Sequence, residues 1–317
     1  MKKRTVLIVT GPTGVGKTEF VDALCAQCPI EIINGDMGQM YTPLSIGTAK
    51  PVLAESSVPY YLFDTICTPT YFSAMKFRSR VLSLIHEIWD RDRTPVIVGG
   101  SSFYLLSLFF PTAEDDQEDG QRNETSLLQS QDLWHELERI DPDRAREIDP
   151  KDTYRLERAL AIWKSTGQKP SDYKPTFDPF AATVFVWLER DRAQLYDRIN
   201  ERVLSMIDSG WIEEVQSLDD EWEQFLKKKK IIGYDTIFEY LAGAFDKSEL
   251  VAGIQKKTRN YAKRQMTFWR SFKRKLIEGY ASFKNQTDKP LKIVELNLTH
   301  DDIERYIKQL KNEIGCE

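Results

Sequence analysis

The chain has 317 residues, of which 41% are hydrophobic and 29% are charged, and its formal net charge is −5. This length suits one large or two moderate globular domains. No stretch approaches the roughly 18 consecutive apolar residues of a membrane span, and only a short apolar run follows the basic start Met1–Arg4. We therefore expect a cytoplasmic protein that uses neither a membrane nor a secretory signal.

Basic residues are unevenly distributed along the chain. Residues 227–275 hold 14 Lys and Arg but 4 Asp and Glu, a net charge of +10, so the remainder carries −15. Such asymmetry predicts a localised basic face. Charge alone leaves two interpretations open, a nucleic-acid site or a solvated helix surface.

A glycine-rich motif follows the first apolar run, Thr5–Thr10. It has the pattern G-x-x-x-x-G-K-[ST] and consists of Gly11, Pro12, Thr13, Gly14, Val15, Gly16, Lys17 and Thr18. With a strand before it and a helix predicted over residues 19–27, this is the context of a phosphate-binding loop. Backbone N–H groups and the helix N-terminus would face the anion. Lys17 would add a charge, and the Thr18 hydroxyl is placed to hold Mg²⁺. The motif predicts a bound diphosphate, but it does not say that the diphosphate belongs to ATP.

Two cysteines in this helix region, Cys25 and Cys28, have C-x-x-C spacing. No second pair follows, and the three histidines of the chain lie far apart in the sequence. We interpret the cysteines as small apolar residues and not as zinc ligands.

Short apolar runs recur, with helical patterns between several of them. The predicted strands are Thr5–Thr10, Glu31–Ile33, Tyr61–Ile66, Pro95–Val98 and Thr183–Leu188, and Ala74–Asp90 has a helical pattern. This alternation predicts an α/β fold, a parallel sheet flanked by helices. Because ligands bind at the carboxyl ends of such strands, we expect the phosphate loop, Asn34–Asp36 and Gly99–Ser102 to meet at one site.

Asp36 follows the second predicted strand. A carboxylate there can ligate Mg²⁺, act as a general base, or cap the next segment. Its place in the expected crevice favours a functional role.

The alternation of strands and helices stops near residue 111. Residues 112–124 are acidic and almost free of apolar groups, which is typical of a flexible connector, and helical periodicity follows in Leu127–Ile140 and Thr153–Ser165. We predict a helical insertion domain over 112–181. It would interrupt an α/β domain formed by residues 1–111 and 182–317, whose C-terminal part is mainly helical.

Two arginines, Arg198 and Arg202, are four residues apart in a predicted helix over Leu195–Ile207 and therefore share a face. Two guanidinium groups on one face suit a diphosphate leaving group. The alternative is that they form salt bridges to Asp197 and Glu201.

A long helix is predicted from Ile254 to about Ile277. One stripe at helical spacing, expected to face the core, contains Ile254, Thr258, Tyr261, Gln265 or Met266, Trp269, Phe272 and Leu276. Basic residues fall largely on the other faces and are candidates for phosphate contacts.

Taken together, the motifs resemble those of the bacterial tRNA dimethylallyltransferase family. The matching stretches are Gly11–Thr18; Asp36 with Gln39 and Tyr41; Ile46–Pro51; Gly99–Ser101 with Tyr104; Arg155-Leu156 and Arg158–Leu160; Leu195–Val203 with Met206 and Gly210; Ile232–Tyr234; and Tyr261–Gln265 with Thr267 and Arg270. They occur in family order over nearly the whole chain. The sequence departs from the family pattern at Met37, where Ser is usual, at Ser101, where Thr is usual, and in the order Phe268-Trp269.

The resemblance implies a fold similar to that of P-loop NTPases and a specific reaction. The loop 11–18, with Arg198 and Arg202, would bind dimethylallyl diphosphate, with Mg²⁺ as cofactor. The prenyl group would pass to the exocyclic N6 of the adenosine 3′-adjacent to the anticodon. The implied catalytic residues are Asp36, which accepts the proton, with Lys17 and Ser101. The implied contacts to the anticodon stem-loop of tRNA are Asp36, Met37, Gly38, Gln39, Ser101, Arg122, Tyr154, Arg155, Leu156, Glu157, Arg158, Lys263, Arg264, Gln265 and Arg270.

Two other functions remain open at this point. A phosphate loop with an Arg-rich helix is also typical of small-molecule kinases that use ATP, and a relative that binds tRNA without turnover would keep the basic segment. We expect a monomer in each case.

Overall fold

A computed structural model describes residues 4–53, 56, 58–112 and 130–316. Its centre is a six-stranded sheet in the order β3-β2-β4-β1-β5-β6, in which all neighbouring strands are parallel. The strands are β1 Thr5–Thr10, β2 Ile30–Asn34, β3 Tyr60–Tyr61, β4 Thr94–Val98, β5 Ala182–Glu189 and β6 Leu291–Asn297. With the phosphate loop directly after β1, this is a P-loop NTPase-like fold.

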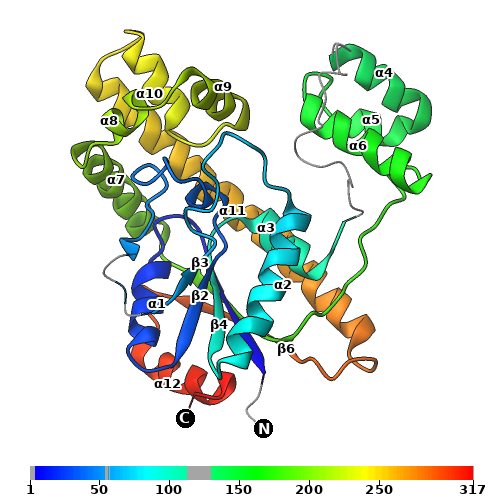
Figure 1. Ribbon diagram of the computed structural model, residues 1–317, viewed down its shortest axis with the longest axis vertical. Helices are drawn as coiled ribbons and strands as arrows, with labels where there is room; N and C mark the ends of the chain where they lie inside the picture. The colour runs from blue at the N-terminus through cyan, green and yellow to red at the C-terminus, as the bar shows by residue number, and fades with distance from the viewer. Residues whose placement is uncertain (1–3, 54–55, 57, 113–129, 317) are drawn as a thin grey trace.

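Helices cover both faces of the sheet (Figure 1). The helices of the sheet domain are α1 Lys17–Cys25, the 3₁₀ helix η1 Met37–Met40, α2 Ala74–Asp90, α3 Ser102–Phe109, α7 Arg192–Asp208, α11 Lys247–Phe283 and α12 Ile303–Ile314. Alternate residues of β1 point to opposite faces. Leu7 and Val9 join the core under α1, α7 and α12, whereas Val6 and Ile8 join the core under α2, α3 and α11.

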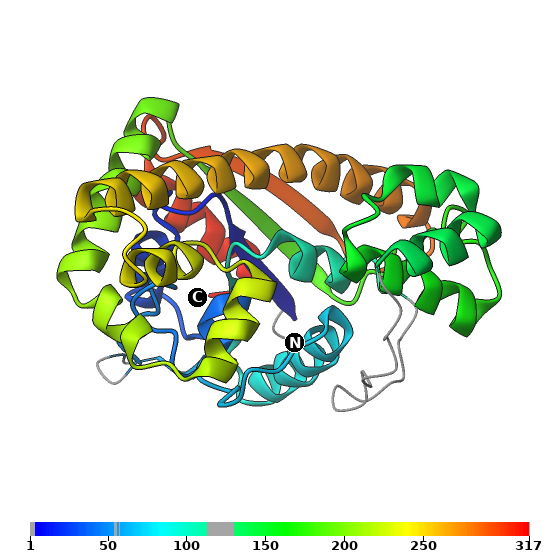
Figure 2. The same cartoon turned by 90° about the horizontal axis from the view of Figure 1, so that it is seen from above.

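Two helical groups extend from this sheet domain. The helices α8 Trp211–Gln216, α9 Asp220–Lys229 and α10 Tyr234–Leu241 pack around a core of their own with parts of α7 and α11. The helices α4 Ser130–Ile140, α5 Pro142–Glu147 and α6 Thr153–Thr166 form a separate lobe around Leu137 and Leu156 (Figure 1). Figure 2 shows α11 crossing the molecule from the α8–α10 group toward the side of the α4–α6 lobe.

Two strands differ from the sequence-based prediction. The strand expected over Tyr61–Ile66 ends at Tyr61, because Leu62 and Asp64 adopt positive φ values of 62° and 52°, which a strand cannot accommodate. The strand β6 was not predicted at all. It is an edge strand whose residues are mostly only half-buried, so its apolar pattern is weak.

The other predicted helices match where the structure describes them, whereas most of the predicted connector 112–124 and the first residues of the helix predicted over Leu127–Ile140 lie outside the described residues. The helix Ala74–Asp90 is found with the same bounds, and the helix predicted from Ile254 to Ile277 extends to Lys247 and Phe283. Its earlier start is fixed by Asp246, which forms a capping box with Glu249. None of the described helices combines the length and the apolar composition needed to cross a bilayer.

Candidate functional site

The loop after β1 curls around the N-terminus of α1. Gly14 has φ +78° and Gly16 has φ +114°, conformations that glycine adopts without steric cost. A Cβ on Gly14 would also come within 2.9 Å of Ile199. These two positions allow the backbone to turn back on itself, and a turn of this kind can present backbone N–H groups to an anion.

Lys17 points into this loop. Its Nζ donates to the carbonyl oxygens of Gly11 and Pro12, each at 3.1 Å. Burial lowers the pKa of Lys17 to about 8, which Asp36 opposes and Arg202 reinforces. An amine in these surroundings is short of negative partners, and a bound anion would supply them.

Three arginines lie around the loop, one directly after β5 and two on α7. Arg190 Nε donates to Val15 O at 3.1 Å, and Arg198 Nε donates to Gly14 O at 3.0 Å. Arg198 also pairs with Glu19 at 2.5 Å, so the predicted alternative, pairing with Asp197 and Glu201, is wrong for Arg198. Within the described part of the chain no hydrogen bond or ion pair holds Arg202. Burial lowers its pKa, which the charge of Asp36 opposes.

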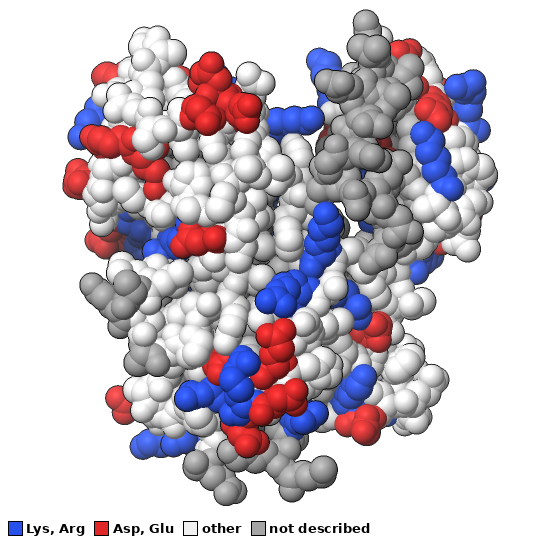
Figure 3. Space-filling model, viewed as in Figure 1, with Lys and Arg blue, Asp and Glu red and all other residues white. Residues whose placement is uncertain are grey.

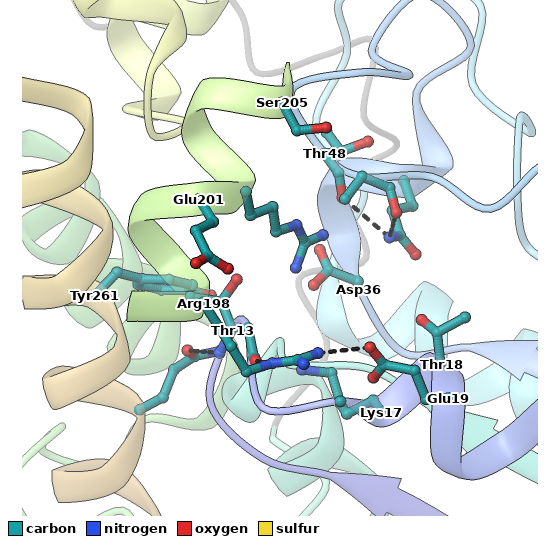
Figure 4. A pocket seen from close by; sticks show the side chains of 16 residues that line it. Thr13, Lys17, Thr18, Glu19, Asp36, Thr48, Arg198, Glu201, Ser205 and Tyr261 are labelled. Atoms are coloured by element: carbon teal, nitrogen blue, oxygen red, sulfur yellow. Dashed lines mark hydrogen bonds and ion pairs between the residues drawn. The ribbon is translucent and has the colours of Figure 1, made fainter. Parts of the chain in front are cut away.

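Asp36 lies across the cleft from Lys17 (Figure 4). It is the N-cap of η1, and its Oδ1 accepts from Gly38 N at 3.2 Å. Asn34 fixes the turn, because its Oδ1 accepts from Asp36 N at 2.7 Å and its Nδ2 donates to Asp36 O at 2.8 Å. Ser101 Oγ accepts from Met37 N at 2.9 Å. Asp36 is therefore both a cap and a carboxylate that lines the cleft.

The cleft has a volume of about 450 Å³. It brings together most of the predicted diphosphate site and Asp36, and Figure 4 shows side chains from the loop, η1, α7 and α11 converging on it. The lining residues that we did not assign to a site are Glu19, Thr48, Ala49, Glu201, Ser205 and Tyr261. Tyr261 was expected in the core. Burial and the nearby charge of Asp36 raise its pKa, so it stays protonated.

Gln265, predicted to contact tRNA, lines the cleft and also links two parts of the site. Its side chain is 4% exposed, its Oε1 accepts from Thr13 N at 2.9 Å, and its Nε2 donates to Gly100 O at 2.8 Å. The amide thus joins the phosphate loop to the turn after β4. Leu156, in contrast, corrects our assignment of a tRNA contact, since it is completely buried in the α4–α6 lobe.

Other predicted tRNA contacts lie on accessible surfaces. Lys263, Arg264 and Arg270 are exposed on α11, and Arg155 and Glu157 are exposed on α6. Arg158 is half-buried and donates to Thr112 Oγ1 at 2.8 Å. Arg122 and the side chain of Tyr154 lie outside the described residues. Met37, Gly38 and Gln39 form η1 beside Asp36, with Gly38 buried.

Known proteins resemble this chain in sequence and in fold. The family model described as IPP transferase matches residues 39–272. A tRNA dimethylallyltransferase of Alkaliphilus metalliredigens is 36% identical over 85% of this chain and 90% of its own length. The crystal structure of a tRNA isopentenylpyrophosphate transferase from Bacillus halodurans is 30% identical, with a TM-score of 0.61 over 98% of this chain and 96% of that chain.

A eukaryotic dimethylallyltransferase acting on tRNA, 23% identical, shows the same fold with a TM-score of 0.75 over 98% of this chain and 79% of that chain. The sequence similarity to the bacterial relatives extends over most of both chains, and the match to the family model covers more than half of this one. The protein therefore belongs to the IPP transferase family.

Proposed function

We propose that this protein transfers a dimethylallyl group from dimethylallyl diphosphate to the exocyclic N6 of the adenosine 3′-adjacent to the anticodon in tRNA. The observation that carries the proposal is that an anion-binding loop and a carboxylate, Asp36, face one cleft. The names of the relatives support the same reaction class.

The loop side of the cleft suits the departure of a diphosphate. The C1–O bond of the substrate breaks, its electron pair stays on the diphosphate, and positive charge develops on the allylic carbon. Lys17 and Arg202 line this side of the cleft, so a diphosphate held by the loop would develop its negative charge beside them. Donors that are already in place stabilise such charge without reorganisation, and removing one costs about 10²–10³ in rate in known sites of this kind.

The Asp36 side of the cleft suits the acceptor. The exocyclic nitrogen of adenine is a weak nucleophile because its lone pair is delocalised into the ring. As N6 forms its bond to C1, its proton passes to Asp36. Ser101 holds the backbone next to Asp36 in position through Met37 N.

Magnesium fits the residues of this site. The Thr18 hydroxyl is exposed at the cleft, and the described residues contain no cluster of three His, Cys, Asp or Glu that would cage a metal. Mg²⁺ commonly uses one or two protein oxygens together with substrate phosphates. Thr18 would hold the ion, and when bound it would neutralise charge on the diphosphate.

The acceptor base has to leave its stack to enter the cleft. Arg264 lies over the ring of Tyr261, which lines the cleft, and Lys263 and Arg270 are exposed on the same helix. We infer that α11 and the exposed side chains of α6 hold the anticodon stem-loop.

One incubation tests the proposal. The protein, unmodified tRNA, Mg²⁺, dimethylallyl diphosphate and ATP are incubated, the ATP remaining is measured, and the digested nucleosides are analysed by mass spectrometry. We expect N6-dimethylallyladenosine at the position next to the anticodon. Consumption of ATP without any prenylated nucleoside would contradict the proposal and favour a kinase, and tRNA binding without product would favour a non-catalytic relative.

A further inference from the structure

The backbone of residues 45–47 converges on one carboxylate. Glu214 Oε2 accepts from Ser45 N at 2.8 Å and from Ile46 N at 2.6 Å, and Oε1 accepts from Gly47 N at 3.2 Å. Glu214 belongs to α8, some 167 to 169 residues away along the chain. Charge-assisted bonds of this kind are about twice as strong as neutral ones.

The surroundings leave little room for another arrangement. Tyr234, which is completely buried, donates its hydroxyl to Glu214 Oε1 at 2.7 Å. A Cβ added to Gly47 or to Gly233 would come within 2.1 Å of the Trp211 indole. Both glycines therefore allow the loop and α10 to close on the tryptophan, with the carboxylate of Glu214 at the same junction.

The loop tied by Glu214 continues into the cleft. Thr48 and Ala49 line the cleft, and their carbonyl oxygens accept from Gln39 Nε2 at 3.0 and 3.1 Å. Gln39 lies in η1, the short helix that Asp36 caps. A line of direct contacts thus runs from Glu214 through residues 45–49 to η1, and Glu214 itself is absent from the lining of the cleft.

The phosphate loop has separate supports. Arg190, Arg198 and Gln265 bond to its backbone, and none of their hydrogen bonds involves Glu214. Loss of the Glu214 carboxylate would therefore disturb the acceptor side of the cleft and leave the diphosphate side intact.

We propose that Glu214 is a positioning residue for prenyl transfer, which anchors residues 45–50 so that η1 presents Asp36 to the acceptor base. The inference rests on the proposed function. A displacement of about 1 Å in such a site can cost on the order of a hundredfold in rate.

Three variants test this role. Glu214→Ala removes all four hydrogen bonds. Glu214→Gln keeps one carbonyl oxygen for Ser45 and Ile46 but turns an amide toward Gly47 N–H. Glu213→Gln changes the exposed neighbour on the same helix and is the matched control. We measure kcat, KM for tRNA, the Kd for dimethylallyl diphosphate, and amide hydrogen exchange of residues 45–47.

We expect the loss of Glu214 to impair the use of tRNA but not the binding of dimethylallyl diphosphate. Glu214→Ala should lower kcat on the order of a hundredfold and raise KM for tRNA, with the Kd for dimethylallyl diphosphate unchanged. Glu214→Gln should recover part of the loss, and Glu213→Gln should match the wild type. Exchange of amides 45–47 should become fast in Glu214→Ala, fast only at Gly47 in Glu214→Gln, and should stay slow in Glu213→Gln.

Several outcomes would overturn the inference. Wild-type kinetics in Glu214→Ala, or unchanged exchange at residues 45–47, would show that the carboxylate does not hold the loop. Equal losses of affinity for tRNA and for dimethylallyl diphosphate in Glu214→Ala, without recovery in Glu214→Gln, would show a general structural role. If the wild-type protein forms no prenylated adenosine, the proposed function fails, and the exchange data report separately on the anchor.

Discussion

Lys17 is the residue whose protonation makes the charge of the site depend on pH. Its neighbours Arg198 and Arg202 stay charged at any physiological pH. The pKa of Lys17, in contrast, is lowered to about 8 by burial among the loop atoms. The amine is therefore protonated below about pH 8 and becomes neutral as pH rises through this value. Its contribution to anion binding should follow the same curve.

We accordingly expect the affinity for dimethylallyl diphosphate to be constant near neutral pH and to fall above about pH 8. The decline should approach about tenfold per pH unit, the limit for one coupled proton. Phosphate groups titrate near pH 6, so the ligand itself does not change charge in this range. Titration calorimetry from pH 7 to 9.5 measures the curve. Lys17→Met should bind weakly at every pH, and an equal decline in that variant would assign the effect to another group.

Asp36 is the residue on which proton transfer depends. Asp36→Asn retains an oxygen for the N-cap bond to Gly38 N but removes the base. We expect kcat to fall by about 10²–10⁴, while the affinities for tRNA and for dimethylallyl diphosphate remain. Single-turnover assays and binding measurements separate the two effects. Asp197→Asn, at an exposed position of α7, is the control, and full turnover in Asp36→Asn would remove Asp36 from the mechanism.

At the scale of elements, local sequence patterns were enough to predict the elements whose formation depends on nearby residues. The phosphate loop, the helix Ala74–Asp90 and the five strands other than β6 are located by motif or periodicity. The strand β3 was too long in the prediction because the positive φ values of Leu62 and Asp64 have no sequence signal. The strand β6 was missed because Lys292 and Glu295 interrupt its apolar pattern at the sheet edge.

Long-range contacts account for the site residues that the sequence did not reveal. Along one stripe of α11, Tyr261 and Gln265 face the cleft, whereas Ile254 before them and Trp269 after them are buried in hydrophobic cores. Helical periodicity in the sequence identifies the stripe, but it does not show which part of the protein each residue of the stripe faces. The link between Glu214 and Gly47 joins distant segments, so no local pattern indicates it.

Replacement by alanine should lower the stability of the protein at Gly47 and raise it at Gly253. In Gly47→Ala the new methyl group would meet the Trp211 ring at 2.1 Å, and overpacking of this kind costs about 1–3 kcal/mol. In Gly253→Ala, in the interior of α11, the methyl group would meet Thr236 at an ordinary 3.6 Å. That change should stabilise the protein by about 0.5–1 kcal/mol through helix propensity.

Denaturant unfolding of the two variants beside the wild type measures these differences. The sign is the decisive result. Stabilisation in Gly47→Ala would mean that the loop can withdraw from Trp211 without cost, and it would weaken the argument that Glu214 and Trp211 together hold residues 45–50.

At the scale of the whole molecule, the distribution of charge bears on where tRNA can bind. The net charge of −5 would oppose binding to a polyanion if it were uniform. The face in Figure 3 shows acidic and basic side chains mixed over the sheet domain and basic side chains beside its junction with the α4–α6 lobe. On α11, Lys263 and Arg270 lie seven residues apart and therefore on the same side of the helix. Arg264 lies 5.7 Å from the ring centre of Tyr261, next to the cleft.

This arrangement leads to a prediction about salt. If Lys263, Arg264 and Arg270 each neutralise a tRNA phosphate, tRNA affinity should fall steeply with ionic strength, because bound counterions are released. Each substitution to Ala should reduce the slope of log K against log salt concentration by about 0.7–0.9 and weaken binding to different tRNAs alike. Filter binding or fluorescence anisotropy over a range of salt measures the slopes.

Lys308→Ala is the matched control, because Lys308 is an exposed lysine on α12, which Figure 1 shows at the opposite end of the sheet from the α8–α10 group. Its slope should equal that of the wild type. If all four variants share the wild-type slope, tRNA does not bind along α11, and its backbone must be held by the α4–α6 lobe alone. A reduced slope for the three α11 variants together with normal binding of dimethylallyl diphosphate would instead show that α11 holds tRNA apart from the diphosphate site, as the proposed transfer to an extruded adenine requires.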